Sequence, residues 1–254
     1  MADATATDLG EAIARARCIV AFTGAGISTE SGIPDFRGPQ GVWTKLSPSD
    51  FTLSKYVGDV EHRKRVWRMR LERASMRYEP NPAHRALVEL ERMSLLDCVV
   101  TQNVDGLHVA AGSTTVLELH GNPSIVRCLR CELTVPAPDV FARITAGEDD
   151  PACTACGGIL KSGTILFEEA LPDDVLDEAF YRARQCDLCL IVGSSLVVYP
   201  AAGVPLEAMR NGARLAIVNA EETPFDAYAD VVVRGSAGDV LTAAVEGARR
   251  LLTS

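Results

Sequence analysis

Four cysteines form two C-x-x-C pairs whose spacing is typical of a metal site. The pairs are Cys128 with Cys131 and Cys153 with Cys156. Each pair can place two thiolates on one tight turn, and two such turns complete the tetrahedral shell that Zn²⁺ prefers. All four ligands would come from the protein, so no coordination position is left for a substrate. The pattern predicts one structural zinc ion per chain, with a redox or packing role as the alternative.

The other four cysteines are expected to be small core residues. Cys186 and Cys189 form a third C-x-x-C pair, but it leads into an apolar run typical of a buried strand. Residues three apart in a strand point to opposite faces, so this pair cannot share a metal ion. Cys18 and Cys98 also lie in apolar runs, where cysteine packs as a small hydrophobic residue.

A glycine-rich turn, Gly24-Ala25-Gly26, follows the first apolar run. Glycines let the backbone approach phosphate groups closely, and the N–H groups at a helix start favour negative charge. The spacing is not G-x-G-x-x-G, and no acidic residue follows a second strand about 20 residues on, which disfavours an ordinary dehydrogenase. The turn predicts phosphate binding, with glycines that merely turn the chain as the alternative.

Polar residues follow three further apolar runs, where strands are expected to end. Parallel sheets bind ligands beyond the carboxyl ends of their strands, and amides, hydroxyls and carboxylates can hydrogen-bond phosphate or ribose. Each set alone could be an ordinary polar loop, but three such loops at one edge favour a ligand site. The sets are Gln102, Asn103 and Asp105; Gly193, Ser194 and Ser195; and Asn219 and Glu221.

His120 is the candidate general base among four histidines. It ends an alternating apolar stretch and precedes Gly121. A histidine pKa can lie near the working pH, so this imidazole could take a proton from a sugar hydroxyl.

The elements that must position these residues alternate along the chain. Short apolar runs predict strands at 18–22, 97–101, 188–192, 215–218 and 231–233. Helical periodicity is found at 9–17, 83–93, 173–184 and 239–252. This alternation predicts an α/β fold, with a Rossmann-like parallel sheet covered by helices on both faces.

Two stretches interrupt the alternation and predict a second, smaller domain. Residues 39–82 are charged and helix-rich, whereas 122–160 carry the two Cys pairs and several prolines. We therefore expect a helical insertion and a zinc-ribbon insertion, with the Rossmann-like domain formed by 1–38, 83–121 and 161–254.

Composition limits the class of partner and the location. The 254 residues are 47% hydrophobic and 23% charged, with a net charge of −9, which opposes non-specific nucleic-acid binding. Met1–Asp8 lacks the basic and apolar regions of a secretory signal, so a cytoplasmic location is expected. The chain is also expected to be a monomer. The uncharged window Cys189–Leu206 contains several glycines and prolines, which fits a strand, a loop and a helix start rather than a membrane span.

The order of several motifs resembles that of the sirtuin family, and the similarity covers nearly the whole chain. The glycine turn continues into Gly32-Ile33-Pro34-Asp35-Phe36-Arg37. The later motifs are Thr101-Gln102-Asn103-Val104-Asp105-Gly106-Leu107-His108, Leu119-His120-Gly121-Asn122, Gly193-Ser194-Ser195-Leu196 and Val218-Asn219.

This resemblance implies an enzyme that consumes NAD as a co-substrate to remove an acyl group from lysine. The products would be nicotinamide, O-acyl-ADP-ribose and free lysine. His120 would act as the base on a ribose hydroxyl, and Asn103 and Asp105 would line the nicotinamide pocket. The other NAD contacts implied are Gly24, Ala25, Gly26, Thr29, Asp35, Phe36, Arg37, Gln102, Val104, Gly193, Ser194, Ser195, Asn219, Glu221 and Ala237.

The resemblance also implies an extended acyl-lysine peptide bound by strand addition, which gives little sequence selectivity. Its implied contacts are Phe167 and the segment Val197-Val198-Tyr199. Most sirtuins read Phe-Gly-Glu where this chain has Phe167-Glu168-Glu169, which puts the details of peptide docking in question. The preceding residues 161–165 resemble the branch that includes nuclear animal sirtuins.

Neutral acyl groups are the expected substrates. The Tyr-x-x-Arg pair of the succinyl-removing branch has no counterpart in the stretch 67–73, which lacks tyrosine. Two alternatives stay open at the level of sequence. One is mono-ADP-ribosyl transfer, which breaks the same bond of NAD, and the other is an NAD-sensing module without turnover.

Overall fold

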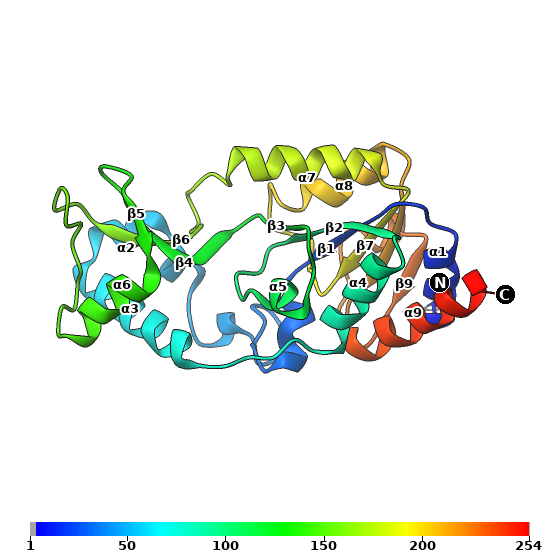
Figure 1. The fold of residues 1–254 in the computed structure, drawn as a ribbon, viewed down its shortest axis with the longest axis horizontal. Helices are drawn as coiled ribbons and strands as arrows, with labels where there is room; N and C mark the ends of the chain where they lie inside the picture. Colours follow the sequence, from blue (N-terminus) through cyan, green and yellow to red (C-terminus); the bar gives the residue numbers. More distant parts are fainter. Residues whose placement is uncertain (1–3, 254) are drawn as a thin grey trace. The chain divides into compact units, whose positions relative to one another are not determined.

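The computed structural model describes residues 4–253 and divides the chain into two compact units. The small unit consists of Val42–Arg77 and His120–Leu171, and the rest of the described chain forms the large unit. Figure 1 shows the chain passing between the two units in both directions.

The large unit is built on a six-stranded sheet with the order β3-β2-β1-β7-β8-β9, and every pairing in it is parallel. Its central strands are buried throughout, as expected for a sheet covered on both faces. The predicted parallel sheet is confirmed. The strands are β1 (Ile19–Thr23), β2 (Leu96–Thr101), β3 (Val116–Glu118), β7 (Leu188–Val192), β8 (Arg214–Val218) and β9 (Val231–Val233).

Two groups of helices cover the sheet, and Figure 1 shows them on opposite sides. In one group α1 and α4 both pack on α9, and in the other α7 packs on α8. Side chains cap the first helices: Thr5 accepts from the N–H of Asp8, and Asn81 caps a helix that begins with Pro82. The helices are α1 (Ala6–Ala14), α4 (Pro82–Arg92), α5 (Leu107–Ala111), α7 (Asp173–Gln185), α8 (Gly203–Arg210) and α9 (Ala237–Thr253).

The small unit packs three helices around a three-stranded antiparallel sheet. Its core surrounds the fully buried Trp67, and the ion pair between Arg63 and Asp150 joins its two chain segments. Short 3-10 helices at Val42–Thr44 and Pro48–Phe51 precede the first α-helix. The elements are α2 (Leu53–Gly58), α3 (Val60–Ser75), α6 (Ala137–Thr145), β4 (Gly121–Cys128), β5 (Thr134–Pro136) and β6 (Leu160–Thr164).

All four predicted domain boundaries differ from those of the compact units, three by two to five residues and the last by eleven. Residues 161–171 were expected in the Rossmann-like domain, but they belong to the small unit. The reason is that β6 pairs antiparallel with β4, with Cys128 opposite Leu160 and Gly121 opposite Thr164.

The cysteines outside the two zinc-type pairs lie in or beside the large sheet, as predicted. Cys98 and Cys189 are buried within β2 and β7, and Cys186 is buried just before β7. Burial raises the pKa of the Cys186 thiol to about 12, so it stays protonated. Cys18 is half-buried.

The uncharged window Cys189–Leu206 forms β7, a loop and the start of α8, as the sequence predicted. Among residues 4–253, no helix is both long and apolar enough to cross a membrane.

The loops that follow β1 and β7 meet backbone to backbone. The N–H of Gly26 donates to the carbonyl oxygen of Gly193 at 2.9 Å, and Gly193 has a φ of +62°. A Cβ atom on Gly193 would lie 2.2 Å from the nitrogen of Ile27. Glycine is therefore required here for both conformation and space.

We expect Gly193→Ala to destabilise the protein by about 2–5 kcal/mol, the sum of the left-handed penalty and overpacking. Gly212→Ala is the matched control, because Gly212 has a φ of +90° with no atom within 4 Å of the added Cβ. That control should lose only about 1–2 kcal/mol. Urea unfolding measures both changes, and equal losses would show that the close approach adds nothing.

Candidate functional site

The glycine turn after β1 is held to the loop after β2 by side-chain hydrogen bonds. Asn103 donates through Nδ2 to the carbonyl oxygen of Gly24 at 3.1 Å and to Ser28 Oγ at 3.3 Å. Ser28 Oγ in turn donates to Asp105 Oδ2 at 2.7 Å. The turn opens a 3-10 helix, Ala25–Ser31, and lies at the carboxyl end of β1, as predicted.

The loop after β7 joins the same group. Gln102 Nε2 donates to Ser194 Oγ at 2.9 Å, so the loops after β2 and β7 are linked directly. Ser194 Oγ also accepts from the N–H of Leu196, which orders this loop, and Ser194 is almost fully buried. Residues predicted from three separate motifs therefore meet at one edge of the sheet.

Two buried histidines lie beneath this edge. Thr23 Oγ1 donates to Thr101 Oγ1 at 2.8 Å and lies 2.9 Å from His108 Nε2. Burial, followed by the neighbouring His84, lowers the pKa of His108 to about 3, and burial also lowers the pKa of His84. Both rings are therefore neutral near pH 7 and act as packed hydrogen-bonding groups. Neither threonine was predicted as a site residue, although Thr101 ends a predicted strand and Thr23 directly follows one.

The loop after β8 is held by hydrogen bonds from Arg234, a residue that was not predicted to belong to the site. Arg234 Nη1 donates to the carbonyl oxygens of Asn219 at 3.2 Å and Glu221 at 2.8 Å. Its Nη2 pairs with Asp226. Asn219 Nδ2 also donates to the carbonyl oxygen of Glu221 at 2.8 Å. The two candidate ribose ligands thus share one closed loop at the end of β8.

Ala237 is the buried first residue of α9, and both of its chain neighbours, Ser236 and Gly238, donate hydrogen bonds to Glu30. The carboxylate of Glu30 accepts from Ser236 Oγ at 2.9 Å and from the N–H of Gly238 at 2.8 Å. Glu30 belongs to the 3-10 helix after β1, so this contact ties the glycine turn to the start of α9. Thr29 Oγ1 donates to the carbonyl oxygen of Gly26 at 2.9 Å.

The Asp35-Phe36-Arg37 segment is more exposed than the loops at the strand ends. Asp35 Oδ1 accepts from the N–H of Gly38 at 2.9 Å, whereas Phe36 and Arg37 are exposed. The remaining candidates of the large unit, Ala25, Val104 and Ser195, are partly buried within the loops already described.

The three candidate catalytic residues belong to different units. Asn103 and Asp105 lie in the large unit, whereas His120 is the first residue of the second segment of the small unit, His120–Leu171. The strand before His120 ends two residues earlier than its apolar pattern suggested, at Glu118. The carbonyl oxygen of His120 accepts from the N–H of Ile165 at 2.8 Å, which joins the turn to the end of β6.

The candidate substrate residues are divided in the same way. Phe167 belongs to the small unit, where it forms a parallel bridge with Thr52 and its ring lies 6.4 Å from that of Trp43. Val197 and Tyr199 are exposed in the large unit, and Val198 is partly buried.

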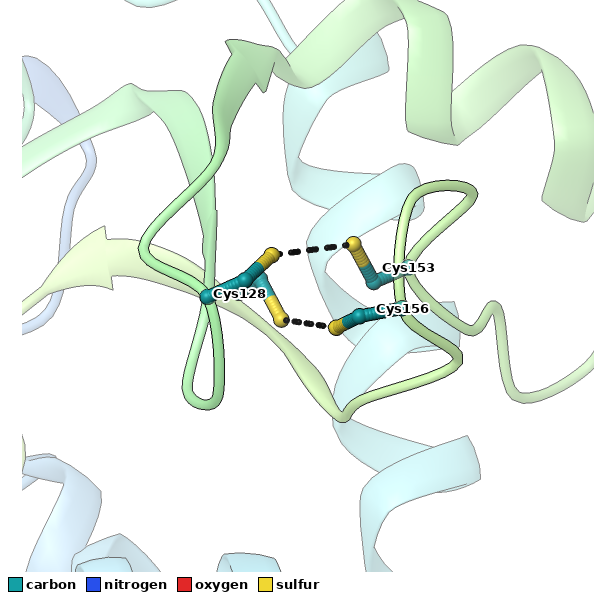
Figure 2. A group of neighbouring side chains, drawn as sticks. Cys128, Cys153 and Cys156 are labelled. Carbon is teal, nitrogen blue, oxygen red and sulfur yellow. Dashed lines mark hydrogen bonds between the residues drawn. The ribbon is translucent and has the colours of Figure 1, made fainter.

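The four predicted zinc ligands converge in the small unit. Figure 2 shows this cluster, with Cys128, Cys153 and Cys156 labelled. All four sulfur atoms lie within 4.8 Å of one another. The Cys128–Cys156 and Cys131–Cys153 sulfur distances are 3.5 and 3.7 Å. A tetrahedral ion with Zn–S bonds of about 2.3 Å needs sulfur separations of about 3.8 Å, so the cluster fits zinc.

The backbone around Cys128 favours its thiolate. The N–H groups of Cys131 and Arg130 lower the pKa of Cys128 to about 6, and the thiol groups of Cys156 and Cys131 contribute less. A thiolate is the form that binds a metal ion. Cys128 and Cys153 also form part of the core around Trp67, so the cluster and the core of the small unit are continuous.

Comparison with known proteins shows that the chain belongs to the Sir2 family, whose model matches residues 24–200. It is 48% identical to NAD-dependent protein deacetylase 2 of Streptomyces coelicolor over 233 residues, which cover 90% of this chain and 97% of that protein. It is 43% identical to NAD-dependent protein deacetylase 1 of Pyrobaculum aerophilum over 98% of both chains.

Solved structures agree with this assignment. A chain from a structural study of the mechanism and regulation of Sir2 enzymes has a TM-score of 0.90 and 44% identity, over 97% of this chain and 98% of its own. A Sir2 homologue–NAD complex has a TM-score of 0.85 and 38% identity, over 96% of this chain and 94% of its own.

We expect the protein to contain one equivalent of zinc, which elemental analysis would measure. Cys131→Ser should lose the metal, whereas the matched control Cys18→Ser should retain it because Cys18 lies in the other unit. Since the cluster is continuous with the core around Trp67, chelation should expose residues 120–171 to proteolysis. Unchanged protease resistance after complete metal removal would contradict a structural role for zinc.

Proposed function

We propose that the chain is an NAD-dependent protein-lysine deacetylase that consumes NAD and releases nicotinamide, O-acyl-ADP-ribose and free lysine. One observation carries the proposal. In a member of the Sir2 family, polar groups from separate sequence motifs meet at the carboxyl ends of β1, β2 and β7. Relatives 43–49% identical to the chain are named NAD-dependent protein deacetylases.

The loops at the sheet edge offer complementary groups for NAD. The N–H groups of Gly24 and Gly26 already donate to the carbonyl oxygens of Val192 and Gly193, so the turn would hold phosphate through the N–H of Ala25 at the start of the 3-10 helix. Ser194 and Ser195 supply hydroxyls nearby. The closed loop with Asn219 and Glu221 would accept the hydroxyls of a ribose. These roles follow from donor and acceptor chemistry at a sheet edge.

Asn103 and Asp105 are proposed to bind the nicotinamide part. Asn103 is 8% exposed, and its amide is oriented by Gly24 and Ser28. Asp105 is held by Ser28 and by the N–H of Leu107 at 2.9 Å, so its carboxylate has a defined orientation. Positioned polar groups of this kind orient a substrate before reaction.

His120 is proposed to take a proton from a ribose hydroxyl. Its place in the turn between β3 and β4, with its carbonyl oxygen bonded to Ile165, fixes the main chain that carries the imidazole. The proposed zinc ion lies apart from this chemistry, because its four ligands leave no position for a substrate.

Acyl-lysine peptides are the proposed second substrate. A solved Sir2 variant with a deacetylated p53 peptide and 3′-O-acetyl ADP-ribose has a TM-score of 0.87 and is 37% identical, over 95% of this chain and 98% of its own. Phe167 is exposed in the small unit, and Val197 and Tyr199 are exposed in the large unit, so each is accessible as a proposed peptide contact. The net charge of −9 supports proteins rather than nucleic acid as substrates. A monomeric state and a cytoplasmic location stay predictions.

We expect His120→Ala to lower turnover of an acetylated peptide by at least about 100-fold, the usual contribution of a general base. Its dissociation constant for NAD should change less than about threefold, since the NAD loops lie in the large unit. Calorimetry measures binding, chromatography measures product, and thermal unfolding checks that the variant is folded.

Three outcomes would contradict this assignment. Turnover retained by the folded variant would exclude His120 as the base. NAD binding by the wild type without any turnover would favour a sensing module. Label from NAD fixed on the protein substrate, rather than found in O-acetyl-ADP-ribose, would favour an ADP-ribosyltransferase.

A further inference from the structure

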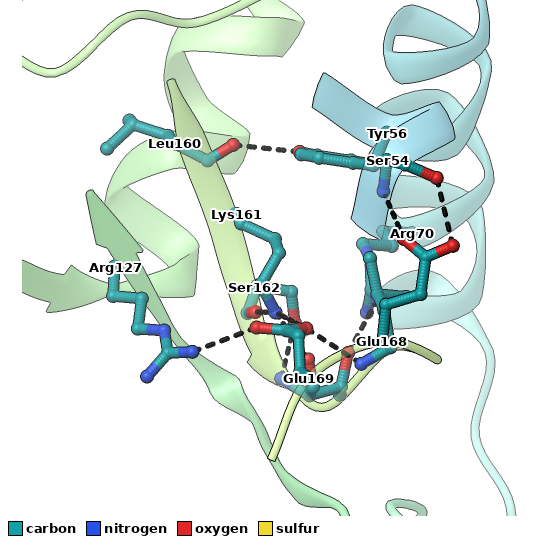
Figure 3. A network of polar contacts seen from close by, with 11 residues as sticks. Ser54, Tyr56, Arg70, Arg127, Leu160, Lys161, Ser162, Glu168 and Glu169 are labelled. Carbon is teal, nitrogen blue, oxygen red and sulfur yellow. Dashed lines mark hydrogen bonds and ion pairs between the residues drawn. The ribbon is translucent and has the colours of Figure 1, made fainter. Parts of the chain in front are cut away.

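Residues 165–169 form a loop of the small unit that follows β6 and carries Phe167. The neighbouring carboxylates of Glu168 and Glu169 point to different parts of this unit, as Figure 3 shows. Glu169 contacts Lys161 and Arg127 in the sheet, whereas Glu168 contacts Ser54 in α2. The two side chains therefore hold the loop from opposite sides.

Glu169 provides the buried anchor. Its Oε2 lies 2.9 Å from Lys161 Nζ and accepts from the N–H of Leu166 at 2.8 Å, and its Oε1 lies 2.9 Å from Arg127 Nη2. Lys161 is fully buried and also donates to the carbonyl oxygens of Ser162 and Thr164. Removing the Glu169 carboxylate would leave the buried Lys161 ammonium without its ion pair, so this side of the loop is structural.

Glu168 provides the outer contact. Its Oε2 accepts from the N–H of Ser54 at 2.8 Å, and its Oε1 accepts from Ser54 Oγ at 3.0 Å. Beside it, the N–H of Phe167 donates to the carbonyl oxygen of Phe51 at 2.9 Å, and the N–H of Leu53 donates to that of Phe167 at 3.0 Å. The Glu168–Ser54 contact thus closes the row of bonds that holds Phe167 against residues 51–54.

The backbone of Glu168 adds a second observation. Its φ is +74°, in the left-handed region that glycine adopts readily and glutamate rarely does. Within residues 4–253, the N–H and C=O groups of Glu168 make no hydrogen bond, so this stretch of main chain stays open to a partner strand. A strained residue at an open edge, held by its own side chain, points to a functional constraint.

We propose that Glu168 is a positioning residue for the acyl-lysine substrate. Its carboxylate holds Phe167 and the open main chain beside it in the conformation against which an extended peptide pairs. This inference rests on the proposed function, because only a deacylase brings such a peptide to Phe167. Most sirtuins have a glycine at this position, which adopts the left-handed conformation freely. Here Glu168 adopts it, and its side chain makes a specific contact with Ser54 in α2.

A positioning role has a kinetic signature that a general loss of stability does not share. Glu168→Ala should raise the KM for an acetylated peptide about three- to tenfold, the range expected for losing solvent-exposed hydrogen bonds to a charged group. The KM for NAD and kcat should change less than about twofold. Glu168→Gln should recover part of the loss, because its amide oxygen can still accept from the N–H of Ser54.

Glu132→Ala is the matched control. Glu132 is also a glutamate of the small unit with a positive φ, +59°, and its side chain makes no hydrogen bond to any part of residues 4–253. This variant should leave both KM values unchanged. An unchanged peptide KM in Glu168→Ala, or an equal rise in Glu132→Ala, overturns the proposal.

Hydrogen exchange supplies a readout that needs no substrate. The amide of Ser54 should exchange faster in Glu168→Ala than in the wild type and in Glu132→Ala, since its acceptor is removed. An unchanged exchange rate overturns the contact itself. If the wild type deacylates no peptide but the Ser54 amide responds as expected, the proposed function fails while the contact stands.

Discussion

The large unit depends on a contact between two glycines. The turn after β1 and the end of β7 come so close at Gly26 and Gly193 that no side chain fits between them. The N–H of Gly26 is used in this contact, and the N–H of Gly193 donates to the carbonyl oxygen of Val218 at 2.9 Å. This glycine pair thereby sets the spacing of the ends of β1, β7 and β8. The positions of the polar loops that follow these strands depend on that spacing.

The polar groups at this edge are oriented before any ligand arrives. Asn103, Ser28 and Asp105 bond one another in a chain, and Gln102 reaches Ser194 on a different loop. Beneath them, buried threonines and neutral histidines fill the sheet edge without placing a charge there. Such preorganised groups avoid the loss of binding energy that ordering a flexible loop would entail.

Two inserted segments build the small unit around a different constraint. Its sheet has only three strands, and its core is continuous with the four cysteines. A core of this size is small for independent stability, so metal coordination would supply part of what apolar burial does not. The same unit contains His120 and Phe167. The proposed zinc ion would therefore affect function only by stabilising the unit that contains these two residues.

The sequence predicted the sheet, the cysteine cluster and the polar strand ends because each leaves a local pattern. Runs such as Leu188–Val192 are apolar throughout, and C-x-x-C spacing is set by the geometry of one turn. The assignment of residues 161–171 to the small unit could not be predicted from a local pattern. It depends on the pairing of β6 with β4, which lie more than thirty residues apart in the sequence.

Arg234 and Ser54 were missed for a related reason. Arg234 follows β9 as an isolated arginine, and Ser54 is one of several serines near a helix start. Their roles depend on partners distant in sequence, Glu221 for Arg234 and Glu168 for Ser54. Glu168 was visible in the sequence as a departure from the family pattern, but its left-handed backbone and its partner required the structure.

The most direct measurement of the central claim is the stoichiometry of one reaction. Mass spectrometry of the wild-type protein with NAD and an acetylated lysine peptide can quantify nicotinamide, free-lysine peptide and O-acetyl-ADP-ribose together. We expect equal amounts of the three, with negligible NAD cleavage in the presence of the unacetylated peptide. Lysine release without nicotinamide, or nicotinamide release that does not depend on the acetyl group, would contradict it.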